Sequence, residues 1–130
     1  MFKNKILINS ILAIVIAMFI SGCGPTNPQL VIQKNSVSMM KLKIGMSSQD
    51  ALNIMGVGIM EDIANPVRVE MYNEKGKEIK VAYYYTQIQK SDGAITDDEL
   101  TPIIFVDDKL IGISRAILES TIKKYELRVR

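Results

Sequence analysis

Residues 78–88 read Glu78-Ile79-Lys80-Val81-Ala82-Tyr83-Tyr84-Tyr85-Thr86-Gln87-Ile88. Apolar or aromatic side chains recur at every second position, which is the period of a β-strand whose two faces have different surroundings. One face would carry Ile79, Val81, Tyr83 and Tyr85, and the other Lys80, Ala82, Tyr84 and Thr86. We expect the first face to pack against helices and Tyr84 to point away from them.

The segments on both sides of this stretch also have strand patterns. After Pro66, residues 67–72 alternate in the order Val67, Arg68, Val69, Glu70, Met71, Tyr72, and a turn-like sequence follows at 73–76. Residues 101–106 form another apolar run, which predicts a strand. Asp107-Asp108-Lys109 predicts a tight turn after it, and residues 110–113 are predicted to be its continuation or a partner strand. Short turns join antiparallel neighbours, so the sequence predicts a three- to four-stranded antiparallel sheet.

Helical patterns lie before and after the predicted sheet. Ser47 is a good N-cap with Asp50 three residues later, which predicts a helix from Ser48 to Met55 that Gly56 closes. A weaker pattern predicts a first helix over about residues 35–43, and Ser114 can cap a C-terminal helix over residues 115–125. The prediction is therefore one α+β domain over residues 35–130, with two short N-terminal helices packed on the sheet and a C-terminal helix. Residues 126–130 alternate and read either as a short strand or as a frayed tail.

The first 22 residues have the pattern of a secretory signal peptide. Lys3 and Lys5 form a basic start, residues 6–20 are almost wholly apolar, and Ser21 and Gly22 are small. As a helix, residues 6–20 rise about 23 Å, which is less than the hydrocarbon core of a bilayer. A cleaved signal therefore fits better than the alternative, an uncleaved anchor helix.

Ile20-Ser21-Gly22-Cys23 resembles the lipobox of bacterial lipoproteins. The resemblance implies that Cys23 receives a diacylglycerol, that the signal is cleaved before it, and that the new amino terminus is acylated. Two or three acyl chains give stable anchoring. The polar, proline-containing residues that follow suggest a tether over 23–34, and Gly24, in place of Asp, favours the outer membrane. The alternative is a chance cysteine behind an ordinary signal.

A second resemblance covers the helix and the sheet. Leu42-Lys43-Ile44-Gly45-Met46-Ser47 with Met55-Gly56 resembles the signature of the SmpA/OmlA (BamE) lipoproteins, although Gly58 stands where that family usually has Pro. Blocks between residues 40 and 113, among them residues 84–87 and 105–112, are similar to a group of uncharacterised bacterial lipoproteins. These resemblances imply a small two-helix, three-strand fold on an envelope membrane, and no activity.

The inventory of side chains argues against several classes of protein. The chain has no His and one Cys, which rules out a His/Cys zinc site and an intramolecular disulfide. Loss of Lys3 and Lys5 leaves equal numbers of basic and acidic residues, so we expect no nucleic-acid partner.

Two charged segments have more than one interpretation. The acidic loop at 90–99 lacks calcium-loop spacing and is interpreted as a solvated loop, with a weak divalent site as the alternative. The basic end, 123–130, reads as solvated or as a contact for lipid headgroups.

The sequence thus predicts a non-enzymatic protein without metal or cofactor. We expect a lipid-anchored accessory or scaffold protein that faces the periplasm from the outer membrane and binds an envelope protein partner. Arg68, Tyr72 and Tyr84 are the predicted contact residues, because we expect them on the outward face of the sheet, and Arg and aromatic side chains dominate interface hot spots. The alternative is a periplasmic module that binds a small ligand, a lipid or a cell-wall fragment in a cleft lined by Tyr83 or Tyr85.

Overall fold

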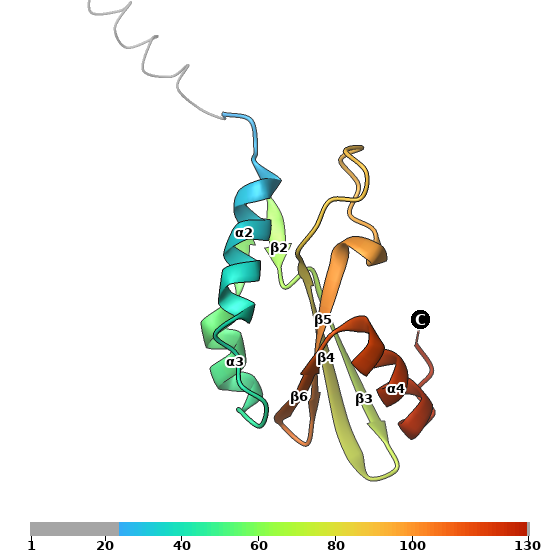
Figure 1. Ribbon diagram of the computed structural model, residues 1–130. Helices are drawn as coiled ribbons and strands as arrows, with labels where there is room; N and C mark the ends of the chain where they lie inside the picture. Colours follow the sequence, from blue (N-terminus) through green and yellow to red (C-terminus); the bar gives the residue numbers. More distant parts are fainter. Residues whose placement is uncertain (1–23, 130) are drawn as a thin grey trace, which may run out of the picture.

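The computed structural model describes residues 24–129, with helices on both sides of a central sheet (Figure 1). The predicted signal peptide and Cys23 lie outside these residues. The elements in chain order are α2 (Pro28–Met39), α3 (Ser48–Met55), β1 (Gly58–Met60), β2 (Ile63–Asn65), β3 (Arg68–Glu74), β4 (Lys77–Tyr85), a 3₁₀ turn (Asp97–Glu99), β5 (Leu100–Val106), β6 (Lys109–Ile113) and α4 (Arg115–Tyr125). The predicted α+β class is confirmed.

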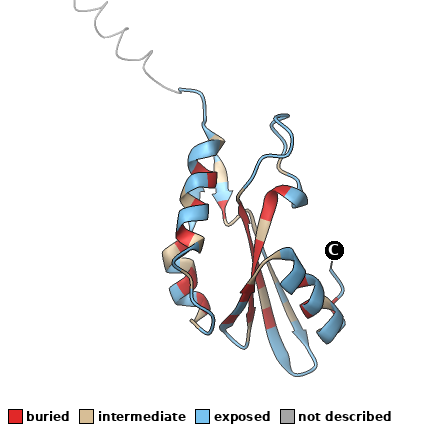
Figure 2. Ribbon diagram, viewed as in Figure 1, coloured by how far each residue is buried: buried red, intermediate tan, exposed pale blue. Residues whose placement is uncertain are grey.

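The main sheet has four antiparallel strands in the order β3-β4-β5-β6. Its central strands are buried on both faces, as the red of β4 and β5 in Figure 2 shows. On one face Ile79, Val81 and Tyr83 join Leu118 of α4 in a first core cluster. On the other face Ala82 and Tyr84 join Met55 of α3 in a second. The sheet therefore needs helices on both sides, whereas the sequence predicted one buried face.

Helix α3 has the predicted bounds and a short extended segment fixes it to the sheet. The Ser47 hydroxyl accepts a hydrogen bond from the Asp50 amide at 3.1 Å, and Gly56 ends the helix at φ +79°. Just before α3, the Gly45 amide donates to Leu110 O and the Leu110 amide donates to Met46 O, both at 2.8 Å. The Gly-Met-Ser signature thus has a structural role, because it runs along the outer edge of β6.

Helix α2 begins at Pro28 and ends at Met39, whereas the sequence predicted a tether to residue 34 and a helix over 35–43. The Asn27 side chain accepts a hydrogen bond from the Gln29 amide, and a proline at the first helical position needs no N–H partner. The sequence reading mistook this Asn-Pro start for a flexible linker. Val31 and Ile32 are buried in the first core cluster, so the folded domain starts before residue 35.

A buried amide pair joins α2 to the rest of the domain. The Asn35 side chain donates to the Asn65 side chain and to the carbonyl of Tyr85, both at 2.9 Å. Asn65 in turn donates to the carbonyl of Met55 at 3.5 Å. These bonds connect α2, β2, β4 and the end of α3, so they fix the position of the first helix.

Three hairpins close through two-residue turns in which both central residues have positive φ. They are Glu61-Asp62, Lys75-Gly76 and Asp107-Asp108. Turns of this kind match the twist of antiparallel strands. The second and third lie where the sequence predicted turns. The first joins β1 to β2 in a separate two-stranded ribbon that the sequence did not reveal, because each strand is three residues long and Glu-Asp is not a typical hairpin turn.

Helix α4 packs closely over β6 at Gly112. An added Cβ at this position would lie 2.5 Å from Cγ2 of Ile117, which is too close for two carbon atoms. Glycine here allows the helix to approach the sheet.

We predict that Gly112→Ala lowers the free energy of unfolding by about 1–3 kcal/mol, because a side chain is forced into a packed contact. Gly24→Ala is the matched control, since nothing lies near an added Cβ there. Ile117→Ala should recover part of the loss in the double variant, because it removes Cγ1 and Cγ2 of Ile117 but leaves its Cβ at 2.9 Å. Urea unfolding followed by circular dichroism measures the free energy of unfolding of these three variants and of the unaltered protein. Equal stabilities of Gly112→Ala and Gly24→Ala would contradict the close packing.

Candidate functional site

Tyr84 is not on an outward face, and its prediction as a partner-binding residue is wrong. Its side chain is fully buried between β4 and α3, in contact with the second core cluster. The prediction failed because it assumed helices on one face of the sheet only. The Tyr84 hydroxyl has no hydrogen-bond partner among the described residues, and burial raises the pKa of Tyr84 to about 12.

We predict that Tyr84→Phe leaves the free energy of unfolding unchanged or raises it by about 1 kcal/mol, because it removes a buried hydroxyl that makes no hydrogen bond. Tyr83→Phe is the matched comparison. The Tyr83 hydroxyl donates to Glu70 Oε2 at 2.9 Å, so its loss should cost about 0.5–1.5 kcal/mol. Chemical denaturation of both variants measures the difference, and a larger loss for Tyr84→Phe would contradict this account.

Arg68 and Tyr72 do come together, in a cluster at the outer strand of the sheet. The Arg68 cluster consists of Arg68, Glu70, Tyr72, Tyr83 and Asp97. Arg68 Nη1 lies 2.6 Å from Asp97 Oδ1, and its guanidinium stacks 4.0 Å from the centre of the Tyr83 ring. Glu70 Oε2 accepts hydrogen bonds from Tyr72 at 2.7 Å and from Tyr83 at 2.9 Å.

The strand register explains this arrangement. Arg68 lies opposite Tyr83 and Glu70 lies opposite Val81, so the polar side chains of β3 share the face that α4 covers in part. The Nε atom of Arg68 is 3.1 Å from Glu70 Oε1, although its N–H is not aligned for a hydrogen bond. The sequence predicted Arg68 and Tyr72 on a face turned away from the helices; they lie instead on the face of Tyr83 and Ile79, next to α4. Sequence alternation did not reveal Asp97, which approaches from a loop twenty-nine positions away.

The electrostatics of the Arg68 cluster suit binding rather than proton transfer. The hydrogen bond to Asp97 raises the pKa of Arg68, and the same contact lowers the pKa of the Asp97 carboxyl. Burial, followed by the hydrogen bond to Glu70, raises the pKa of the Tyr72 phenol. Arg68, Asp97 and Tyr72 therefore keep their protonation states through neutral pH, and the cluster holds a fixed pattern of charge and hydrogen-bonding groups.

A cavity of about 420 Å³ lies where the chain enters the domain. It lies between the start of α2, the β1–β2 turn and the loop after β4, and Tyr85 forms part of its wall. The other lining residues are Thr26, Pro28, Glu61, Asp62, Ile63, Ile88, Lys90, Ser91, Gly93, Ala94 and Ile95. The cavity is thus lined by apolar side chains together with the charged residues Glu61, Asp62 and Lys90, a mixture found in small-molecule sites.

Comparison with known protein families identifies the family of this chain. The model of a family described as "Protein of unknown function (DUF3192)" matches residues 15–119. This chain belongs to the DUF3192 family. No curated protein and no solved structure matches it significantly.

The match to DUF3192 begins inside the apolar segment of the predicted signal peptide and ends within α4. It therefore includes both sheets, the Arg68 cluster and the cavity. The family description assigns no activity, so any function of the DUF3192 domain has to be argued from these two sites.

Glu99 organises the loop that forms one wall of the cavity. Its buried carboxylate accepts hydrogen bonds from the amides of Gln89 at 2.7 Å, Lys90 at 3.2 Å and Thr96 at 3.1 Å. These backbone contacts lower the pKa of Glu99. The Glu99 carboxylate thus has a structural role within the acidic loop, which the sequence did not indicate.

We predict that acid loosens this loop before it unfolds the DUF3192 domain. A carboxyl whose pKa is lower in the folded state contributes stability above its ordinary pKa, about 4.3, and loses it as the pH falls through the folded value. The protection of the Gln89 and Lys90 amides against hydrogen exchange, relative to the intrinsic rate at each pH, should therefore fall below about pH 4. Glu99→Gln should show fast exchange already at pH 7; slow exchange in that variant would contradict the role of Glu99.

The part of the chain that the structure describes contains neither a metal-binding cluster nor a membrane-spanning helix. Within residues 24–129, no three His, Cys, Asp or Glu side chains gather as a metal site. No helix in that range has the length and apolar character needed to cross a membrane.

Proposed function

We propose that this DUF3192 protein is a lipid-anchored envelope protein that acts as an accessory or scaffold by binding a protein partner through the Arg68 cluster. The lipobox-like Ile20-Ser21-Gly22-Cys23 supports attachment through Cys23, and Gly24 supports the outer membrane with the domain in the periplasm. The resemblance of residues 42–47 to the SmpA/OmlA (BamE) signature supports a role in outer-membrane assembly or integrity.

The observation that carries the proposal is the fixed position of Arg68. Its side chain is one-third exposed, while Asp97, Glu70 and the Tyr83 ring hold it in place. An arginine that is already ordered loses little side-chain entropy when it binds, and Arg and Tyr are the residues that most often dominate interfaces. The geometry therefore suits recognition of a carboxylate or a backbone carbonyl on a partner protein.

We predict that a photo-crosslinking residue at position 72 captures a specific envelope protein from intact cells. The same residue at Gln49, which is exposed on α3, is the matched control. Arg68→Ala should weaken the position-72 adduct about tenfold or more, as for a hot-spot residue, while Lys41→Ala should leave it unchanged. Mass spectrometry of the adducts identifies the partner. Identical adducts from positions 72 and 49 would contradict the proposal.

A second candidate function rests on the cavity beside Tyr85. A volume of about 420 Å³ with an apolar wall suits a small ligand, a lipid chain or a cell-wall fragment. Thermal-shift measurements against envelope lipids and glycans test this candidate, with Ala94→Trp as the variant that fills the cavity. A shift in the unaltered protein that the filled variant lacks supports ligand binding, and a flat response in both removes it.

A further inference from the structure

We propose that β3 pairs antiparallel with β3 of a second copy of this chain, in a register centred on Met71, to form a continuous eight-stranded sheet. The argument rests on three features of the described residues: an open strand edge, apolar side chains exposed beside it, and charges that match in one register. It does not depend on lipid attachment at Cys23.

The two edge strands of the main sheet, β6 and β3, differ in whether another segment pairs with them. At β6 the segment 45–48 runs alongside the strand, with two backbone hydrogen bonds at 2.8 Å and an antiparallel bridge between Ser47 and Lys109. At β3, no backbone hydrogen bond from residues 24–129 reaches the side that faces away from β4. An open edge presents unpaired N–H and C=O groups, which readily accept another strand.

Strand β3 also lacks several of the devices that usually protect an edge. Its seven residues contain neither Pro nor Lys, and it pairs with β4 in one continuous register without a bulge. Val69 and Met71 lie on the face away from α4 and are 47% and 58% exposed. A second strand would cover part of this apolar surface.

The charges of β3 select the partner and the register. A twofold axis through Met71 places Arg68 opposite Glu74 of the second copy, and Glu70 opposite Tyr72. Centring on Glu70 would place that residue opposite its own copy, and centring on Tyr72 would place Glu70 opposite Glu74. Like charges in these positions are destabilising, whereas opposite charges stabilise a strand pair. Centring on Val69 would place Arg68 opposite Glu70, but only residues 68–70 of β3 would then be paired. A register shifted by a single residue would join the face that carries Arg68 in one copy to the face that carries Met71 in the other. Such registers are therefore excluded.

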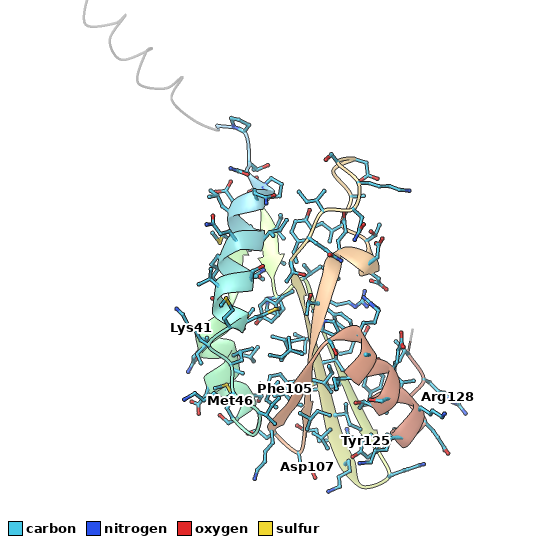
Figure 3. The ribbon with its side chains drawn as sticks, viewed as in Figure 1. Lys41, Met46, Phe105, Asp107, Tyr125 and Arg128 are labelled. Atoms are coloured by element: carbon cyan, nitrogen blue, oxygen red, sulfur yellow. The ribbon has the colours of Figure 1, made fainter. Side chains whose placement is uncertain are left out.

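A hollow and a basic side chain lie beside β3. A hollow of about 380 Å³ lies beside Glu70, Met71 and Tyr72, and Arg128 of the C-terminal segment borders it. Figure 3 shows Arg128 on the segment that follows α4, at the outer side of the molecule. In the proposed register Glu70 of the second copy would arrive near Arg128, which adds a second attraction between opposite charges.

The test uses the full-length protein in its own membranes with Met71→Cys. Residues on the twofold axis lie about 4.5–5.5 Å apart between their Cα atoms, which suits a disulfide. Mild oxidation should give about tenfold more disulfide-linked dimer than Ile59→Cys, whose side chain is 80% exposed on β1. The unaltered chain reports any background from Cys23, so a failure of lipidation is seen separately.

Charge variants of the Met71→Cys protein test the register. Glu74 is exposed, so Glu74→Lys should leave the fold intact while it places a positive charge opposite Arg68 of the second copy. This variant should reduce the dimer several-fold, and Glu74→Gln should reduce it less. Crosslinking at Met71 that does not exceed the Ile59 control, or adducts with another protein in place of the dimer, would overturn the proposal.

Discussion

The burial of β4 on both faces is the constraint on which the rest of the molecule depends. Ile79, Val81 and Tyr83 on one face and Ala82 and Tyr84 on the other are all shielded from solvent. A strand of this kind leaves the sheet unstable unless both faces are covered. Helix α3 covers one face and α4 covers the other, and β5 repeats the pattern beside β4. The helices therefore leave little of the central sheet for a partner.

The surface that remains is the side of β3. The Gly45-Met46-Ser47 segment closes β6, and α4 passes close above it at Gly112. At β3 the Arg68 cluster lies on one face, exposed apolar side chains lie on the other, and the strand edge between them is open. Partner binding and pairing of two copies thus use neighbouring parts of one region, and a dimer would place two Arg68 clusters on the same face of one sheet.

Sequence patterns predicted the elements whose signals are local. The Ser47 cap, the Gly56 end and the alternation of β4 each follow from neighbouring residues, so α3 and the sheet agree with the prediction. The burial of Tyr84 and the contact of Asp97 with Arg68 depend on residues far apart in the chain, so no local pattern indicated them. The sequence did not predict the start of α2 at Pro28, because Asn27-Pro28 fits a turn in a linker as well as it fits the start of a helix.

Hydrogen exchange of the two edge strands in the full-length protein tests this account most directly. At low protein concentration, the amide of Leu110 in β6 should exchange slowly because it donates to Met46 O, while the outward amides of β3 should exchange within seconds. As the concentration in the membrane rises, protection should increase at β3 and stay constant at β6. Strong protection of β3 at every concentration, or exchange at β6 as fast as at β3, would contradict a sheet with one closed and one open edge.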